Sequence, residues 1–88
     1  MANRAQSRRV WEAARDRGVK PLSWRLYDAL LDAARKHGTH EANNGSAAYD
    51  LERRGLVTIA YPYATATQAG REVLAKIANA AYGVNTAG

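Results

Sequence analysis

Arginine is the residue type whose chemistry and placement in this sequence point most directly to a ligand. Of the 88 residues, 13 are Lys or Arg and 8 are Asp or Glu, and the first 20 residues hold six basic residues against two acidic ones. A guanidinium group forms paired hydrogen bonds with phosphate oxygens. We therefore expect an anionic partner, with double-stranded DNA as the leading candidate, contacted in this segment by Arg4, Arg8, Arg9 and Arg15.

The same arginines also have a structural interpretation. Glu12 lies four residues after Arg8 and three residues before Arg15, which is the spacing of ion pairs along a helix surface. A GC-rich genome would also raise the arginine content without any function. From the sequence, both alternatives to phosphate binding stay open.

A second group of candidate contacts surrounds a short predicted helix in the middle of the chain. Amide and guanidinium groups pair with base edges, and a helix N-terminus favours an anion. Asp50 and Glu52 weaken the positive field there, so a solvated, capped helix is the structural alternative. The candidate nucleic-acid contacts in this region are Asn43, Asn44, Ser46, Tyr49 and Arg53.

Other chemistry is weakly represented. The absence of cysteine excludes a disulfide framework, a thiolate metal site and a cysteine nucleophile. His37, His40 and Glu41 have a metal-like spacing, but no further ligand is evident. No Ser, His and acid set suggests catalysis. We therefore expect no enzyme activity, no metal and no cofactor.

The longest apolar runs have three residues, far fewer than a membrane span or a secretory signal needs. We expect a cytoplasmic protein with no membrane partner.

Hydrophobic periodicity predicts the elements that would position the candidate residues. Apolar residues recur every three or four positions in an amphipathic helix, and β-branched residues concentrate in strands. Glycine and proline mark the connections. We expect helices over residues 3–17, 24–36, 46–54 and 68–82, a loop or very short helix over 39–45, and a hairpin of strands 56–60 and 64–67.

Local chemistry makes further predictions. Ser23 and Thr67 are expected N-caps, and Gly55 is expected to close a helix in the left-handed conformation. The Tyr61–Pro62 bond is a candidate for a cis peptide in the hairpin turn. The expected core consists of Trp24, Tyr27, Leu30, Leu31, Leu51, Leu56, Val57, Ile59, Val73, Leu74 and Ile77.

Three aromatic residues are candidate protein contacts. Tyr61 and Tyr63 flank the proline of the hairpin turn, so at least one of them should be exposed. Exposed aromatic side chains are common anchors in protein interfaces. Trp11 belongs either to this class or to the core.

Two runs resemble parts of the winged-helix family. The run from Leu51 to Val57, LERRGLV, resembles the end of the recognition helix and the first wing strand in MarR-like repressors. The run from Thr65 to Arg71 is similar to the LT-x-x-G-R that enters the closing helix, with Ala66 where Leu is usual. The resemblance covers about residues 22–82.

The resemblance implies a mainly α fold with a small β-hairpin. It is a winged helix of order α-α-α-β-β-α with an added N-terminal helix. The implied organisation is a basic helix and connector over residues 1–20, a winged-helix domain over 21–82 and a flexible tail over 83–88.

Two departures bear on function. Residues 39–45 leave little room for the usual middle helix, and residues 56–70 contain no Lys or Arg, whereas a DNA-binding wing offers cations to phosphate. The first hypothesis is a small DNA-binding regulator or architectural factor, of phage type or otherwise, acting alone or as a homodimer. The alternative is a protein-interaction module that binds and inhibits or modulates a host protein.

Overall fold

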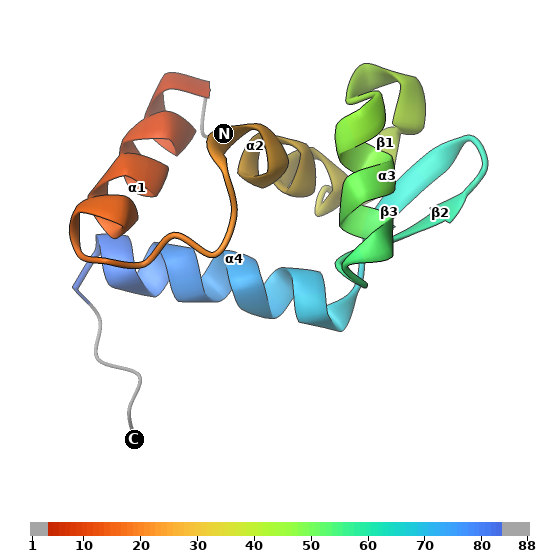
Figure 1. Ribbon diagram of the computed structural model, residues 1–88. Helices are drawn as coiled ribbons and strands as arrows, with labels where there is room; N and C mark the ends of the chain where they lie inside the picture. The colour runs from red at the N-terminus through yellow and green to blue at the C-terminus, as the bar shows by residue number, and fades with distance from the viewer. Residues whose placement is uncertain (1–3, 84–88) are drawn as a thin grey trace.

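The computed structural model describes residues 4–83, which form a mainly helical fold with a small antiparallel sheet (Figure 1). Residue 3, the predicted start of the first helix, and residues 84–88 of the predicted tail lie outside this range. The elements, in chain order, are α1 (Arg4–Asp16), α2 (Trp24–Ala33), β1 (Thr39–His40), the 3-10 helix η1 (Glu41–Asn43), α3 (Ser46–Arg53), β2 (Val57–Ala60), β3 (Tyr63–Ala66) and α4 (Gln68–Ala81).

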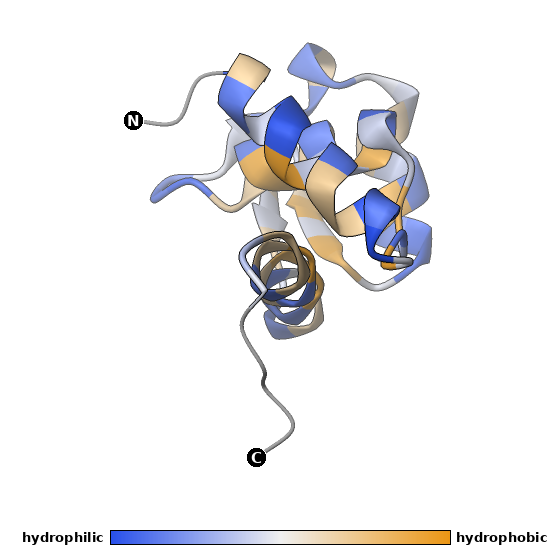
Figure 2. Ribbon diagram, turned by 90° about the vertical axis from the view of Figure 1, so that its left-hand side faces the viewer, coloured by the Kyte–Doolittle hydropathy of each residue, from blue (hydrophilic) through white to orange (hydrophobic). Residues whose placement is uncertain are grey.

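Helix α1 packs against α4 and α2 and shares their core. Its apolar face is narrow, so it needs this contact to be stable as a helix. Figure 2 looks almost along α4 and shows hydrophilic and hydrophobic residues following one another along α1. Trp11 is 6% exposed, and its indole N–H donates to the Leu22 carbonyl at 2.9 Å. Trp11 therefore lies in the core, and the interpretation of this residue as a surface contact is wrong.

Helix α2 begins as predicted and ends early. The Ser23 hydroxyl accepts from the Leu26 N–H, which confirms the N-cap. The helix ends at Ala33, three residues before its predicted end, so Arg35 and Lys36 lie beyond it. The chain must turn here into β1. Gly38, with a φ of +71°, lies so close to the Ala64 carbonyl that a Cβ at this position would collide with it.

The predicted hairpin of β2 and β3 is confirmed, with Val57 opposite Ala66 and Ile59 opposite Ala64. The Tyr61–Pro62 peptide is cis, as predicted. Strand β1 is absent from the prediction. It pairs with β3 on the other side, Thr39 opposite Ala64, so the sheet has three strands in the order β1-β3-β2. Residues 39–45 thus contain a very short helix, η1, which was one of the two predicted alternatives, and a strand, which was not predicted.

The two runs with family resemblance join α3, β2 and α4 at one point. Gly55 has a φ of +76°, as predicted, and the Leu56 N–H donates back to the Leu51 carbonyl. The Thr67 hydroxyl accepts from the Gly70 N–H at 3.1 Å and donates to the Gly55 carbonyl at 2.8 Å. These residues have a structural role, because each contact fixes the point at which one helix or strand follows another.

All eleven predicted core residues belong to one cluster, in which Leu30, Leu51 and Ile77 are fully buried. Five of them, including Trp24, are only partly buried. Leu22, Leu26 and several alanines complete the cluster and were not in the predicted set. In the described part of the chain no helix is long and apolar enough to cross a bilayer.

Candidate nucleic-acid interface

Asp50 gathers three arginines from two helices on the outer side of α3. Its carboxylate lies 3.2 Å from Arg54 Nε, 4.0 Å from an Arg53 guanidinium nitrogen and 3.7 Å from that of Arg25 in α2. One negative charge faces three positive ones, so the cluster keeps an excess of two positive charges. Ion pairs this exposed contribute only about 0–1 kcal/mol each, so their guanidinium groups exchange partners readily. We call these four residues the Asp50 cluster.

The first turn of α3 adjoins the Asp50 cluster. Arg25 donates to the Ser46 hydroxyl at 3.3 Å, so its side chain reaches across this turn. The N-cap is Gly45, which offers no side-chain cap. The N–H groups of Ala47 and Ala48 already donate to the Asn44 and Gly45 carbonyls. The positive charge available at this end of α3 therefore comes chiefly from Arg25.

Of the five residues predicted around α3, only Ser46 and Arg53 lie next to the Asp50 cluster or within it. The Asn43 amide donates to the Thr39 hydroxyl at 3.2 Å. The Asn44 amide nitrogen is buried and has no hydrogen-bond partner. The Tyr49 hydroxyl donates to Glu41 at 3.2 Å. The Asn43 and Tyr49 side chains therefore face β1 and η1, away from the Asp50 cluster.

Sequence reasoning did not select Arg25 and Arg54 as site residues. The signal for Arg54 was present, because it follows Asp50 by four positions and i,i+4 pairs share a helix face. No local signal exists for Arg25, since it lies on another helix, 25 positions before Asp50. Only the packing of α2 against α3 brings these two residues together.

Three of the four predicted arginines of α1 have partners within the described residues. Arg4 pairs with Asp28 of α2 at 3.4 Å. Arg8 pairs with Glu12 at 3.6 Å, as the structural interpretation predicts. Arg15 pairs with the neighbouring Asp16 instead of Glu12. These pairs are exposed, and phosphate can compete for such arginines.

The indole rings of α1 and α2 hold two of these arginines in place. The Arg8 guanidinium lies 5.1 Å from the ring centroids of both Trp11 and Trp24, and that of Arg15 lies 5.3 Å from Trp11. Cation–π contacts leave the guanidinium N–H groups at the edge free for other partners. Arg9 is exposed, and no ion pair to it is found between residues 4 and 83.

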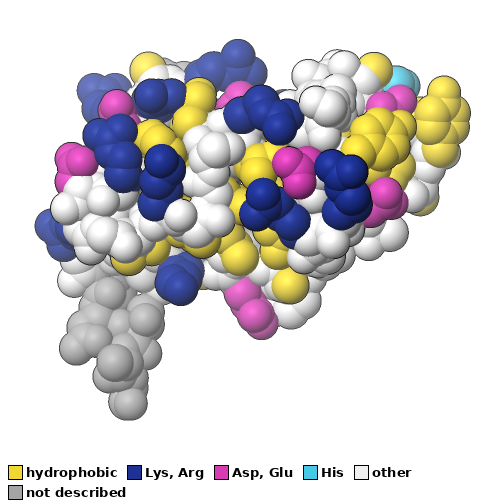
Figure 3. Space-filling model, in the orientation of Figure 1, with side chains coloured by type: hydrophobic (Ala, Val, Ile, Leu, Met, Phe, Trp, Pro, Cys, Tyr) yellow, Lys and Arg dark blue, Asp and Glu magenta, His cyan; other side chains and the backbone are white. Residues whose placement is uncertain are grey.

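Lys and Arg side chains extend over α1, α2 and α3 on the face seen in Figure 3. The Arg4–Asp28 pair links α1 to α2, and the Arg25–Asp50 pair links α2 to α3. We call this surface the basic face; it consists of the exposed arginines Arg4, Arg8, Arg15, Arg25, Arg53 and Arg54. At the β2–β3 turn, by contrast, Figure 3 shows hydrophobic side chains.

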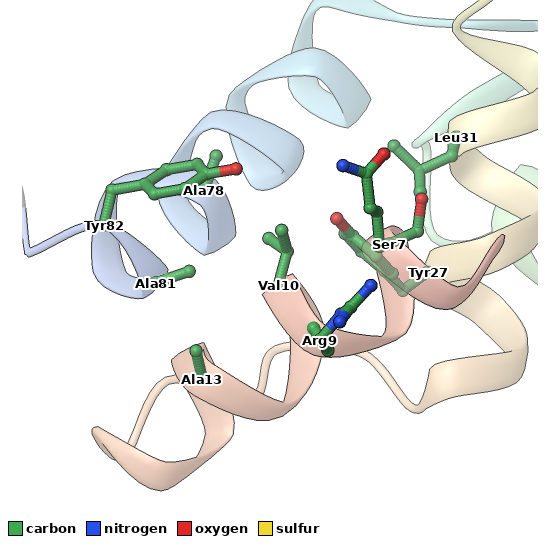
Figure 4. A pocket seen from close by; sticks show the side chains of 10 residues that line it. Ser7, Arg9, Val10, Ala13, Tyr27, Leu31, Ala78, Ala81 and Tyr82 are labelled. Carbon is green, nitrogen blue, oxygen red and sulfur yellow. The ribbon is translucent and has the colours of Figure 1, made fainter. Parts of the chain in front are cut away.

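A groove of about 620 Å³ is lined by residues of α1, α2 and the end of α4 (Figure 4). Tyr27 and Leu31 lie against it, Arg9 and Tyr82 lie at its sides, and the rest of its lining is small or uncharged. Burial raises the pKa of Tyr27 above its ordinary value. Among the described residues that line the groove there is no His, Asp or Glu.

The histidine motif has a structural role. His40 Nδ1 accepts from the Ala42 N–H at 3.1 Å and so caps η1. Within residues 4–83, no three His, Asp or Glu side chains come together as a group that could hold a metal ion.

We assign a function from these contacts, because comparison with known proteins does not supply one. The arginines of the basic face combine exposure with excess positive charge. No protein-family model, no curated protein and no solved structure matches this chain.

Proposed function

We propose that this protein binds double-stranded DNA as a small regulator or architectural factor of winged-helix type. The order α2, β1, η1, α3, β2, β3, with β3 between the other two strands, supports this fold assignment. In this proposal η1 takes the place of the middle helix, and β2 and β3 form a short wing. Helix α3 then serves as the recognition helix and enters the major groove.

The observation that carries the proposal is the excess of positive charge in the Asp50 cluster. Arg25 and Arg53 have 57% and 79% of their side-chain surface exposed, although both lie near Asp50. The three guanidinium groups bear more positive charge than the single shared carboxylate can neutralise, and a guanidinium group binds phosphate in paired hydrogen bonds. The proposed contacts of α3 are therefore Arg25, Arg53 and Arg54, with Ser46 beside them.

Helix α1 extends the proposed interface along the DNA backbone. Arg4, Arg8 and Arg15 lie on the same basic face, whereas Arg9 lies beside the groove between α1 and α4. The Arg4–Asp28 pair joins α1 to α2. Contacts of this kind position a protein on the duplex without reading the sequence. We propose that Arg4, Arg8, Arg9 and Arg15 provide such contacts and that the Asp50 cluster places α3.

The test is duplex binding by fluorescence anisotropy over a range of salt concentrations. The wild-type affinity should fall steeply between about 50 and 200 mM salt, because counterions are released on binding. The variant R25Q/R53Q/R54Q should flatten the slope of log affinity against log salt by about 0.9 for each lost contact, or about 2–3 units. Absence of binding by the wild-type protein at low salt would contradict the proposal.

A matched control separates site from net charge. The variant R35Q/R71Q/K76Q removes the same formal charge from the end of α2 and from α4. It should keep the wild-type slope. If both triple variants flatten the slope equally, binding is diffuse and the Asp50 cluster is not the interface.

A second candidate function is a protein-interaction module, and the chemistry of the wing favours it. Residues 55–70 carry no charged side chain, and Tyr61 and Tyr63 are exposed there. A wing of this kind suits a protein partner better than phosphate. A protein that binds through the wing and fails to bind duplex DNA at low salt would fulfil this second function alone.

A further inference from the structure

We propose that the wing end of the molecule is a docking surface for a Lys- or Arg-bearing segment of a partner protein. The inference is independent of DNA binding, since it concerns the opposite side of α3. We call the surface the tyrosine surface; it comprises His40, Glu41, Tyr49, Tyr61, Pro62 and Tyr63.

The first observation is the concentration of exposed aromatic side chains. Three large side chains from α3, the β2–β3 turn and β3 are exposed, with Tyr61 at 81%, Tyr63 at 54% and Tyr49 at 45%. Scattered exposed tyrosines need no explanation, but a cluster of them indicates an interaction site. Tyrosine is enriched in interfaces because it supplies a large, rigid contact area.

The second observation is that the cluster is held together by specific contacts. The Glu41 N–H donates to the Pro62 carbonyl at 2.8 Å, which ties η1 to the hairpin turn. The Glu41 carboxylate accepts from the Tyr49 hydroxyl at 3.2 Å. His40 lies opposite Tyr63 in the sheet, with ring centroids 5.9 Å apart and nearly perpendicular. The surface is therefore largely formed before any partner binds, which lowers the entropy cost of binding.

The third observation is the sign of the charge on and around the tyrosine surface. Residues 55–70 are uncharged, and the carboxylates near Tyr49 are those of Glu41 and Glu52. The cation at the border, Arg53, pairs with Asp50 on the other side. A site that combines aromatic faces with carboxylates is complementary to a guanidinium or ammonium group, through cation–π and ionic contacts.

A different protein is the proposed occupant, not a second copy of this chain. The obvious cationic segment of a second copy is α1, but Arg4, Arg8 and Arg15 already contact carboxylates within their own chain. Arg8 and Arg15 also lie over indole rings. These contacts can exchange, but a second copy also carries a net charge of +5, and a partner protein of lower positive charge avoids the repulsion between two such chains.

The test uses two synthetic peptides of equal length and opposite charge, one of alternating Arg and Gly and one of alternating Glu and Gly. The protein carries a net charge of +5, so general attraction favours the Glu peptide. Amide shifts in an NMR titration should nevertheless place the Arg peptide at residues 40–41 and 61–63. Equal shifts from both peptides, or shifts from the Arg peptide elsewhere only, would overturn the proposal.

Two variants and one control define the contacts. Tyr61→Ala and Glu41→Gln should each weaken binding of the Arg peptide by about two- to five-fold. Tyr82→Ala removes an equally exposed tyrosine, 72% exposed, at the far end of α4 and should change nothing. Loss of affinity in Tyr82→Ala, or none in Tyr61→Ala, would overturn the assignment.

Self-association decides the remaining alternative. Analytical ultracentrifugation of the wild-type protein and of Tyr61→Ala should give the same monomer mass over the concentration range. Concentration-dependent assembly that Tyr61→Ala abolishes would show that a second copy occupies the tyrosine surface, and it would overturn the choice of a separate partner. Neither readout involves DNA, so failure here is distinguishable from failure of the DNA-binding proposal.

Discussion

The basic face and the tyrosine surface lie on either side of α3 and differ in how they are built. Long, exposed arginines from three helices make the basic face, and one carboxylate is shared among three of them. Large, rigid aromatic side chains make most of the tyrosine surface, where backbone pairing and a hydrogen bond between η1 and the turn fix their positions. The basic face has a high positive charge and few fixed side-chain positions. The tyrosine surface has fixed side-chain positions and little charge.

This difference in charge and rigidity indicates which kind of ligand suits each surface. Phosphate binding depends mainly on the number of cations and tolerates mobile side chains. A protein interface depends on packed, largely preformed contacts. Under the proposed function, the protein would therefore rely on its helices to bind DNA, and the uncharged β2–β3 turn would be available for another partner.

The largest effect should follow from removing the core residue that supports both surfaces. Leu51 lies on the inner side of α3 and is 0% exposed. Leu51→Ala should lower the free energy of unfolding by about 2–5 kcal/mol, measured by chemical denaturation. Tyr61→Ala, on the exposed turn, serves as the control and should stay within about 0.5 kcal/mol of wild type. A cost below about 1 kcal/mol for Leu51→Ala would mean that α3 is not anchored through this residue.

A smaller effect should follow from removing the arginines of α1. The variant R4A/R8A/R15A should flatten the salt slope of DNA binding by about 2–3 units while the fold survives. Stability should fall modestly, by about 0.5–1 kcal/mol, because Arg8 leaves the faces of Trp11 and Trp24. An unchanged slope would restrict the basic face to the Asp50 cluster and make α1 a structural element.

The smallest effect concerns a proton on the tyrosine surface. The Tyr49 hydroxyl donates to Glu41, and the Glu41 charge disfavours the phenolate, so both raise the pKa of Tyr49 above its ordinary value. Glu41→Gln should lower the pKa of Tyr49 back towards that value, measured by NMR titration of the ring signals. Glu12→Gln, which removes a carboxylate from α1, should have no effect. If the pKa of Tyr49 is the same in Glu41→Gln as in the wild type, the two side chains are not in contact.

The parts of the fold that local chemistry determines were predictable from the sequence. Ser23 and Thr67 cap helices because each has a hydroxyl at the right position, and Gly55 adopts a positive φ where a strand follows a helix directly. Strand β1 was not predictable, because a segment of two residues is too short to show the alternation of apolar and polar residues that marks a strand. Thr39 and His40 form a strand only because β3 lies beside them.

Tertiary packing explains the other differences. Trp11 is more buried than Trp24, because its indole N–H donates a hydrogen bond to the Leu22 carbonyl. The hydrophobic pattern of the helix does not reveal this partner. Arg25 joins Asp50 through the contact between α2 and α3. The sequence therefore identified the helix that carries the candidate site, but not the arginine that another helix supplies.

One measurement tests most directly whether the basic face binds DNA and the wing does not. Random-sequence duplex DNA is titrated into the labelled protein at low salt, and the amide chemical shifts are followed by NMR. The account predicts shifts in α3 around residues 46–54 and in α1, with none at residues 61–63. Shifts concentrated at residues 61–63, with α1 and α3 unchanged, would contradict it.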